Sequence, residues 1–444
     1  MPLVQSFVMK MKLVLFGLAT IFTANIVVGE TLNLKLVPER ELLVKNQPQE
    51  VVIKIDLSAI ADKKKVHRTP LNLAVVLDKS GSMTGSKLEK AKQAATMLVD
   101  QLTSEDVFSF IVYSDEARVV VSAQHVENKN ALKEKIRRVE ADGSTALYAG
   151  VKTGADQIKE YFSSRRINRV ILLSDGLANV GPSSPRELRR LGSDLAERGI
   201  SVTTIGVGDD YNEDLMAGLA EASDANYYYV KDTEKLPQIF AKELGELLTV
   251  AARDVRIEVI CPDGVKPLGF IGRAEKFENQ KAAVTLSQFT SGQNRYLMLR
   301  CLVEKAQPEV ARVRVNYTDE LDGGKNQIVD NVVKIRFTSD QSDSDKSLNG
   351  AVFAEKQLML TAVAKDEAMA QADAGNYKLA AGTLAKQNAA LNSAYAAAPA
   401  TVQMQIRLET NTLDDFAGQL NTGTYGGASR KAMQSQSYNT RNSK

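Results

Sequence analysis

The chain has 444 residues, more than the ~100 to 200 of an ordinary domain, and 44% hydrophobic with 25% charged residues is a globular composition. Its 56 basic and 54 acidic residues leave a formal charge of +2, which gives no electrostatic steering toward nucleic acid, so we expect no nucleic-acid partner. Two His and two Cys exclude zinc fingers, iron–sulfur clusters and His-rich metal centres. Any metal in this chain must therefore be held mainly by oxygen ligands.

The N-terminal segment has the pattern of an export signal. Lys10 and Lys12 precede an uncharged stretch, residues 13–29, and residues 1–29 are therefore predicted to be a secretory signal peptide. An uncleaved membrane anchor that faces outward is the alternative, because the stretch is just short of the ~20 apolar residues that span a bilayer. We expect an exported protein, periplasmic or extracellular, that meets a membrane only through this segment.

Residues 30–69 contain two predicted strands. Apolar and polar residues alternate from Leu32 to Leu36 and again from Val51 to Leu57, which is the period of a half-buried strand. Two such strands cannot be stable alone, so we expect them to belong to a larger sheet.

Between residues 70 and 250 the pattern changes to short apolar runs that alternate with amphipathic stretches. The runs LNLAVVL, VFSFIVY and RVILLS are typical of strands buried on both faces. Leu88, Ala91 and Ala95 recur at the spacing of one helix face. This alternation predicts an α/β unit, with a largely parallel sheet covered by helices on both faces.

The remainder of the chain divides into three predicted segments. Residues 251–338 return to the strand period and are expected to complete a β-sandwich with residues 30–69, which makes the α/β unit an insertion. Residues 348–422 are Ala-rich with helical spacing and predict a small α-helical region. Residues 423–444 are mostly small and polar, with four basic and no acidic residues, and predict a disordered tail.

The two cysteines lie at inward positions of predicted strands. An oxidising compartment would permit a disulfide between Cys261 and Cys301. Two buried free thiols are the alternative, because the sequence does not show whether the two strands oppose each other.

Oxygen-bearing side chains follow predicted strands on three loops. Asp78, Ser80 and Ser82 follow the first buried strand, Thr145 lies in the loop GSTALYAG, and Asp175 ends another buried strand. Open α/β sheets bind ligands at the carboxyl ends of their strands, so these side chains can converge. Two carboxylates and three hydroxyls suit a hard divalent cation. The competing explanation for the first triplet is a helix N-cap.

The three loops, in this order, resemble a known family. DKSGSM, GSTALYAG and LLSDGLANVG are similar to the von Willebrand factor type A (VWA) domain with a complete metal-ion-dependent adhesion site. The resemblance covers Leu71 to Val250 and is nearest to bacterial secreted proteins that resemble inter-alpha-trypsin inhibitor heavy chains. It implies a Rossmann-like, doubly wound sheet.

The resemblance also implies roles for the five residues. Ser80 and Ser82 would bind the metal directly, and Asp78, Thr145 and Asp175 directly or through water. The cofactor would be a divalent cation, Mg²⁺ with Mn²⁺ or Ca²⁺ as alternatives. In the family, an acidic side chain of a protein ligand fills the open coordination position.

Three functional hypotheses follow. The first is an exported, non-enzymatic adhesion module that uses this cation to capture a carboxylate of a partner protein, with no catalytic residues. The second is a metal-dependent hydrolase. The loops offer no His, Lys or spare carboxylate as its general base, and His67 and His125 are expected to be solvated surface residues. The third is a metal-stabilised envelope assembly scaffold.

Overall fold

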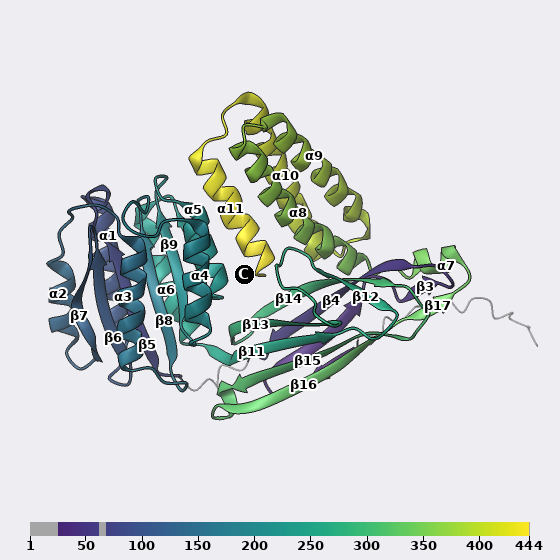
Figure 1. Cartoon of the computed structure of the whole chain (residues 1–444), viewed down its shortest axis with the longest axis horizontal. Coiled ribbons are helices and arrows are strands. Elements are labelled where there is room, and N and C mark those ends of the chain that lie inside the picture. The colour runs from purple at the N-terminus through teal and green to yellow at the C-terminus, as the bar shows by residue number, and fades with distance from the viewer. Residues whose placement is uncertain (1–24, 62–67, 444) are drawn as a thin grey trace, which may run out of the picture.

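The computed structural model describes residues 25–61 and 68–443 (Figure 1). Most of the predicted signal peptide, residues 1–24, and His67 lie outside them. The last residues of that segment, Asn25–Val28, form the short strand β1, which pairs with β2. Within the described ranges, no helix combines the length and apolar character needed to cross a bilayer.

A six-stranded sheet forms the centre of the α/β unit. Its strand order is β10-β9-β8-β5-β6-β7, and every neighbouring pair is parallel except the antiparallel pair of β6 and β7. The strands are β5 (Leu71–Asp78), β6 (Val107–Tyr113), β7 (Ala117–His125), β8 (Ile167–Ser174), β9 (Ser201–Val207) and β10 (Tyr227–Val230). Every residue of β5, β6, β8 and β9 is buried, which explains their continuous apolar runs.

Helices cover both faces of this sheet. One face packs against α1 (Ser86–Gln101), α2 (Lys129–Arg137) and α6 (Leu236–Leu247). The other packs against α3 (Leu147–Glu160), α4 (Pro185–Ala196) and α5 (Glu213–Ala222). Two hydrophobic clusters, one on each face, therefore stabilise a doubly wound α/β fold, and the predicted fold class is confirmed.

Two antiparallel sheets pack face to face beside the α/β unit. Their strand orders are β1-β2-β4-β14-β12 and β13-β11-β15-β16, and one hydrophobic cluster lies between them. The strands are β2 (Leu32–Pro38), β4 (Gln49–Ala59), β11 (Val250–Ile260), β12 (Val265–Phe270), β13 (Lys281–Thr290), β14 (Asn294–Val303), β15 (Glu309–Asp319) and β16 (Lys325–Lys334). A small parallel pair, β3 (Leu42–Val44) with β17 (Arg336–Thr338), extends one end. Because β4 pairs with β14, the α/β unit is an insertion in this sandwich.

Cys261 and Cys301 both point into the sandwich core. Their sulfur atoms lie 3.9 Å apart and both side chains are buried. A disulfide bond is about 2.05 Å long, so in this structure the two residues are thiols.

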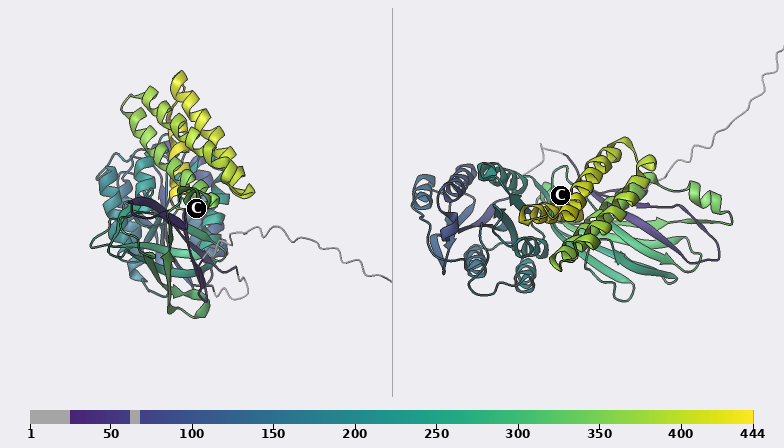
Figure 2. Two further views of the ribbon diagram at one scale, coloured as in Figure 1. Left: turned by 90° about the vertical axis from the view of Figure 1, so that its right-hand side faces the viewer. Right: turned by 90° about the horizontal axis from the view of Figure 1, so that it is seen from above.

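Helices form the rest of the chain. They are α7 (Gln341–Lys346), α8 (Gly350–Asp373), α9 (Tyr377–Ala394), α10 (Ala400–Thr422) and α11 (Gly427–Arg441), with single 3₁₀ turns at η1 (Gly81–Met83), η2 (Thr233–Lys235), η3 (Glu320–Asp322) and η4 (Tyr395–Ala397). Helices α8, α9 and α10 pack around an Ala- and Leu-rich core. This region lies above the junction between the α/β unit and the sandwich (Figure 1 and Figure 2).

The prediction of a disordered tail is wrong, because most of residues 423–444 form α11. This helix lies between α5 and α8 (Figure 1), and its Met433 and Tyr438 are fully buried. Arg430 pairs with Glu213 of α5 at 2.7 Å and with Asp373 of α8 at 2.6 Å. The polar composition suggested disorder, but the carboxylate partners of these basic residues come from distant parts of the chain.

Asp106 anchors the entry of the chain into the α/β unit. Its fully buried carboxylate accepts hydrogen bonds from Leu71 N at 2.9 Å, from Thr103 N at 2.7 Å and from the Arg68 guanidinium at 3.0 Å. Burial alone would raise the pKa of Asp106, but these hydrogen bonds outweigh it and lower the pKa below its ordinary value.

Acid should therefore remove the stabilisation that Asp106 provides. Because its folded pKa is lowered, the stabilisation is complete above the ordinary pKa of about 3.9 and is lost as the pH falls through the folded value. We expect Asp106→Asn to lower the free energy of unfolding by about 1.5–3 kcal/mol at neutral pH, with a smaller difference in acid. Denaturant unfolding of both proteins from about pH 3 to 7 measures this difference. If the free energies of unfolding of the two proteins differed by the same amount at every pH, the prediction would be contradicted.

Candidate metal site

The five predicted ligands meet at the carboxyl edge of the six-stranded sheet. Asp78 is the last residue of β5, Asp175 follows β8, and Thr145 precedes α3. Backbone hydrogen bonds connect the loops: Gly81 N donates to Gly143 O at 3.0 Å, and Asp142 N donates to Lys79 O at 2.7 Å. The loops after β5 and before α3 are thereby held against each other.

Asp78 is fully buried and fixes the loop that follows it. Its Oδ1 accepts a hydrogen bond from Ser80 N at 2.9 Å, and its Oδ2 accepts one from Ser174 Oγ at 2.8 Å. Burial raises the pKa of Asp78, and the nearby Asp175 carboxylate adds to this effect. The ionised carboxylate is therefore costly in the folded protein without a cation beside it.

The three hydroxyls face one small space beside Gly176. A Cβ atom added to this glycine would lie 3.1 Å from Thr145 Oγ1, 3.4 Å from Ser82 Oγ and 3.9 Å from Ser80 Oγ. The hydroxyls of Ser80 and Ser82 are 3.1 Å apart, and Ser82 Oγ donates to Asp175 Oδ1 at 2.7 Å. The structure therefore brings all five predicted residues together, and a side chain in place of Gly176 would crowd the space they enclose.

Helix capping does not explain the two serines. Ser80 precedes η1 and Gly85 precedes α1, and neither helix start has a side-chain capping hydrogen bond. The hydroxyls instead point toward each other and toward Asp175. The donor set of two carboxylates and three hydroxyls fits a hard divalent cation such as Mg²⁺. In the part of the chain that the structure describes, this edge of the sheet included, His, Cys, Asp and Glu form no cluster of three or more that could hold a metal, so a cation here would depend on the hydroxyls as well.

Sequence reasoning missed two residues of this site. Lys87, in the first turn of α1, places its ammonium 2.5 Å from Asp175 Oδ2. Asn179, after β8, accepts a hydrogen bond from Thr145 N at 2.8 Å and donates its backbone N–H to Thr145 O at 3.2 Å. The sequence does contain a signal for Lys87: the helix dipole disfavours a cation in the first turn of a helix, so a lysine there suggests a partner outside the helix.

His125 is not part of this site. Its ring Nδ1 lies 3.0 Å from Ser104 O, and the ring packs edge-on against Tyr161. It ends β7 at the opposite edge of the sheet from Asp78, paired with Val107 at the start of β6.

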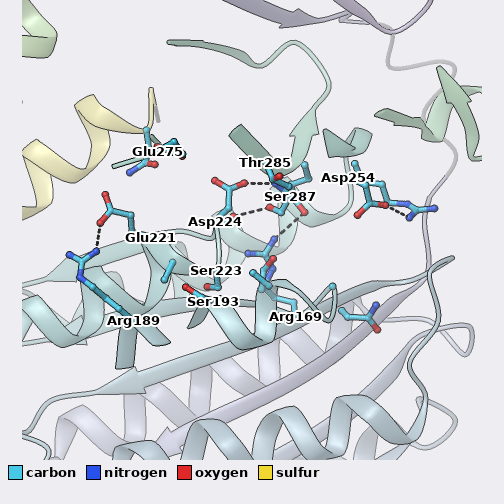
Figure 3. Close-up of a pocket in the computed structure, with 18 of the residues that line it drawn as sticks. Arg169, Arg189, Ser193, Glu221, Ser223, Asp224, Asp254, Glu275, Thr285 and Ser287 are labelled. Carbon is cyan, nitrogen blue, oxygen red and sulfur yellow. Dashed lines mark hydrogen bonds and ion pairs between the residues drawn. The ribbon is translucent and has the colours of Figure 1, made fainter. Parts of the chain in front are cut away.

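A polar cleft of about 1000 Å³ lies where the α/β unit, the sandwich and the helical region meet (Figure 3). None of the five predicted ligands lines it. Its charged side chains largely neutralise one another: Arg189 pairs with Glu221 at 2.8 Å, and Arg273 with Glu275 at 2.6 Å. The cleft therefore marks the junction between the three regions, and its paired arginines give it no clear preference for an anion.

Comparison with known proteins identifies the α/β unit. The von Willebrand factor type A domain family matches residues 72–242. The chain is 29% identical to the uncharacterized protein sll0103 of Synechocystis over 287 residues, which covers 61% of this chain and 68% of that protein. It is 28% identical to the Escherichia coli protein YfbK, covering 48% of this chain and 37% of YfbK.

A human relative matches a shorter part. Inter-alpha-trypsin inhibitor heavy chain H3 is 29% identical over 161 residues, which covers 34% of this chain and 18% of the human protein. The chain thus spans about a third of YfbK and less than a fifth of the heavy chain.

Solved structures share the fold of nearly the whole chain. A von Willebrand factor type A protein from Catenulispora acidiphila superposes with a TM-score of 0.69 at 19% identity, covering 89% of this chain and 91% of that one. The ArnB paralog VWA2 from Sulfolobus acidocaldarius superposes with a TM-score of 0.62 at 16% identity, covering 93% and 98%. The family match, the order of the strands and the shared architecture together show that residues 72–242 of this chain are a von Willebrand factor type A domain.

Proposed function

We propose that this chain is an exported, non-enzymatic protein-binding module that captures an acidic side chain of a partner protein through a divalent cation. Domains of this family are commonly metal-dependent protein-interaction modules. The observation that carries the proposal is the convergence of three hydroxyls on one space beside Gly176, with Asp175 bonded to one of them. The signal-like N-terminal segment supports export.

The same residues account for the proposed chemistry. Asp78 and Asp175 supply the negative charge, and Ser80, Ser82 and Thr145 supply neutral oxygens. A bound divalent cation would supply Lewis-acid attraction for an outside carboxylate oxygen. Because only two of the five ligands are charged, the cation and its ligands together would not carry a net negative charge. We take Mg²⁺ as the cation, with Mn²⁺ or Ca²⁺ as alternatives.

The domain division stays a prediction in its details. We infer a signal segment at residues 1–29, sandwich strands at 30–69 and 251–338, and the α/β domain at 70–250. The structure differs at the first boundary, because Asn25–Val28 already belong to the sandwich sheet as β1. The helical region, predicted at 348–422, extends through α11.

Two other functions have less support. A hydrolase needs a general base, and Lys87, which contacts the site, is engaged in an ion pair with Asp175. A metal-stabilised scaffold would gain thermal stability from metal without gaining partner affinity.

Capture experiments with a matched pair of variants test the proposal. Ser80→Ala removes one hydroxyl from the site, and we expect it to weaken Mg²⁺ binding by about 10- to 100-fold in calorimetric titration. Ser122→Ala, an exposed serine of β7, is the control and should bind like the wild type. The wild type should capture partner proteins from envelope or culture extracts only when Mg²⁺ is present, and Ser80→Ala should not capture them. Capture that survives both the chelator and Ser80→Ala would reject the proposal.

A further inference from the structure

One lysine reaches the proposed metal site from a helix. Lys87 Nζ lies 2.5 Å from Asp175 Oδ2, while Ser82 Oγ donates to the other oxygen of the same carboxylate. Asp175 is fully buried and the Lys87 side chain is 26% exposed. A Cβ atom on Gly208, in the loop after β9, would lie 3.7 Å from the ammonium. The ammonium thus sits between the buried carboxylate and the β9–α5 loop, with part of its surface open to solvent.

The position of Lys87 is not explained by the stability of α1. The helix begins at Ser86, so Lys87 lies at its positive end, where the helix dipole disfavours a cation. The neighbouring lysines of α1 have other partners: Lys90 pairs with Glu234 at 2.6 Å, and Lys92 donates to Val139 O at 3.1 Å. These two hold α1 to adjacent segments, whereas Lys87 contacts the proposed metal site.

The charges of the site depend on this residue. Asp78 and Asp175 carry two negative charges, and Lys87 reduces the sum to one. A divalent cation would raise the sum to one positive charge, whereas without Lys87 the loaded site would be neutral. The net positive site would attract an outside carboxylate more strongly than the neutral site would.

We propose that Lys87 sets both the cation affinity and the ligand preference of this site: it competes with the cation for Asp175 and adds a second positive charge facing the captured carboxylate. The inference rests on the proposed function, because it assumes a divalent cation among the five ligands. It predicts that the wild-type site binds divalent cations more weakly than the same five ligands would without Lys87. It also predicts that the cation-loaded site prefers anionic partners.

Titration with the metal alone tests this inference. Lys87→Met keeps the length of the side chain and removes its charge, and we expect it to bind Mg²⁺ or Mn²⁺ about tenfold more tightly than the wild type in calorimetry. Lys87→Arg should stay within about threefold of the wild type, because it keeps the charge. Lys90→Met, which removes a charge from the same helix away from the site, is the matched control and should not change the affinity.

A second readout separates this role from a structural one. Without metal, Lys87→Met leaves the buried Asp175 carboxylate without the Lys87 ammonium, so the melting temperature of the variant should be lower than that of the wild type. Saturating Mg²⁺ should then raise the melting temperature of the variant by more than it raises that of the wild type. A purely structural lysine would lower the melting temperature and leave the metal affinity equal or weaker, which would overturn the inference. If neither the wild type nor Lys87→Met binds a divalent cation, the proposed function itself fails.

Discussion

Replacing Asp224 with Ala should lower the free energy of unfolding by about 3–5 kcal/mol. Asp224 follows α5 and connects the VWA domain to the sandwich, because its Oδ1 accepts a hydrogen bond from Arg295 Nη2 at 2.9 Å. Its backbone oxygen accepts a second one from Ser287 Oγ at 2.8 Å, and Figure 3 shows these two residues side by side. The Arg295 side chain is only 5% exposed, so Asp224→Ala leaves a buried guanidinium without its main counter-ion. Denaturant unfolding monitored by circular dichroism measures the loss.

A second aspartate provides a matched control for this measurement. Asp254 has a backbone φ of 53°, close to the 45° of Asp224, so an alanine suffers similar backbone strain at either position. The Asp254 carboxylate is 63% exposed and pairs with Arg253 at the surface. We expect Asp254→Ala to cost about 1 kcal/mol. Equal losses in the two variants would show that the Asp224–Arg295 pair does not hold the two domains together.

Replacing Asp78 with Ala should weaken Mg²⁺ binding by at least ~100-fold, more than the loss of a residue that only supports a ligand. The change removes one of the two carboxylates that we propose as ligands and frees Ser80 N and Ser174 Oγ, which Asp78 now holds in place. Asp156→Ala is the control, because Asp156 lies in the last part of α3, away from the three loops, with a side chain 50% exposed. Calorimetric titration should show wild-type affinity for the control.

In the absence of metal, a substitution at Asp78 should not lower the thermal stability of the protein. Because burial raises the pKa of Asp78, its ionised form costs free energy at neutral pH in the absence of a cation. Asp78→Asn keeps an acceptor for Ser80 N and removes this cost, so its metal-free melting temperature should equal or exceed that of the wild type. A variant that binds Mg²⁺ normally would contradict the assignment of Asp78 as a ligand.

Much of the fold and the edge of the candidate site could be predicted because they depend on local pattern. Strands buried on both faces must be continuous apolar runs, and the residues that follow them must lie at one edge of a parallel sheet. This reasoning accounts for Asp78 and Asp175, which end β5 and follow β8. Thr145 lies between two helices, α2 and α3, so its place beside them depended on the family resemblance and not on the strand pattern.

Features that depend on tertiary partners could not be predicted. Lys87 reaches the site from a helix, and nothing in its spacing from Asp175 shows that the two side chains meet. Helix α11 is polar by composition, and it is held by contacts such as that of Arg430 with Glu213, 217 positions earlier in the chain. Local propensity has little weight where such partners decide the outcome.

The way in which the VWA domain is inserted has a consequence for the order of folding. The two ends of the insertion lie side by side: Gly292 N donates to Ile60 O at 3.1 Å, and Ser291 N donates to Thr249 O at 2.8 Å. Pairing β4 with β14 before the insertion folds would require closing a long flexible loop, with its entropic cost. A folded VWA domain holds those ends together in advance, so we expect it to form first and to template closure of the sandwich around its own termini.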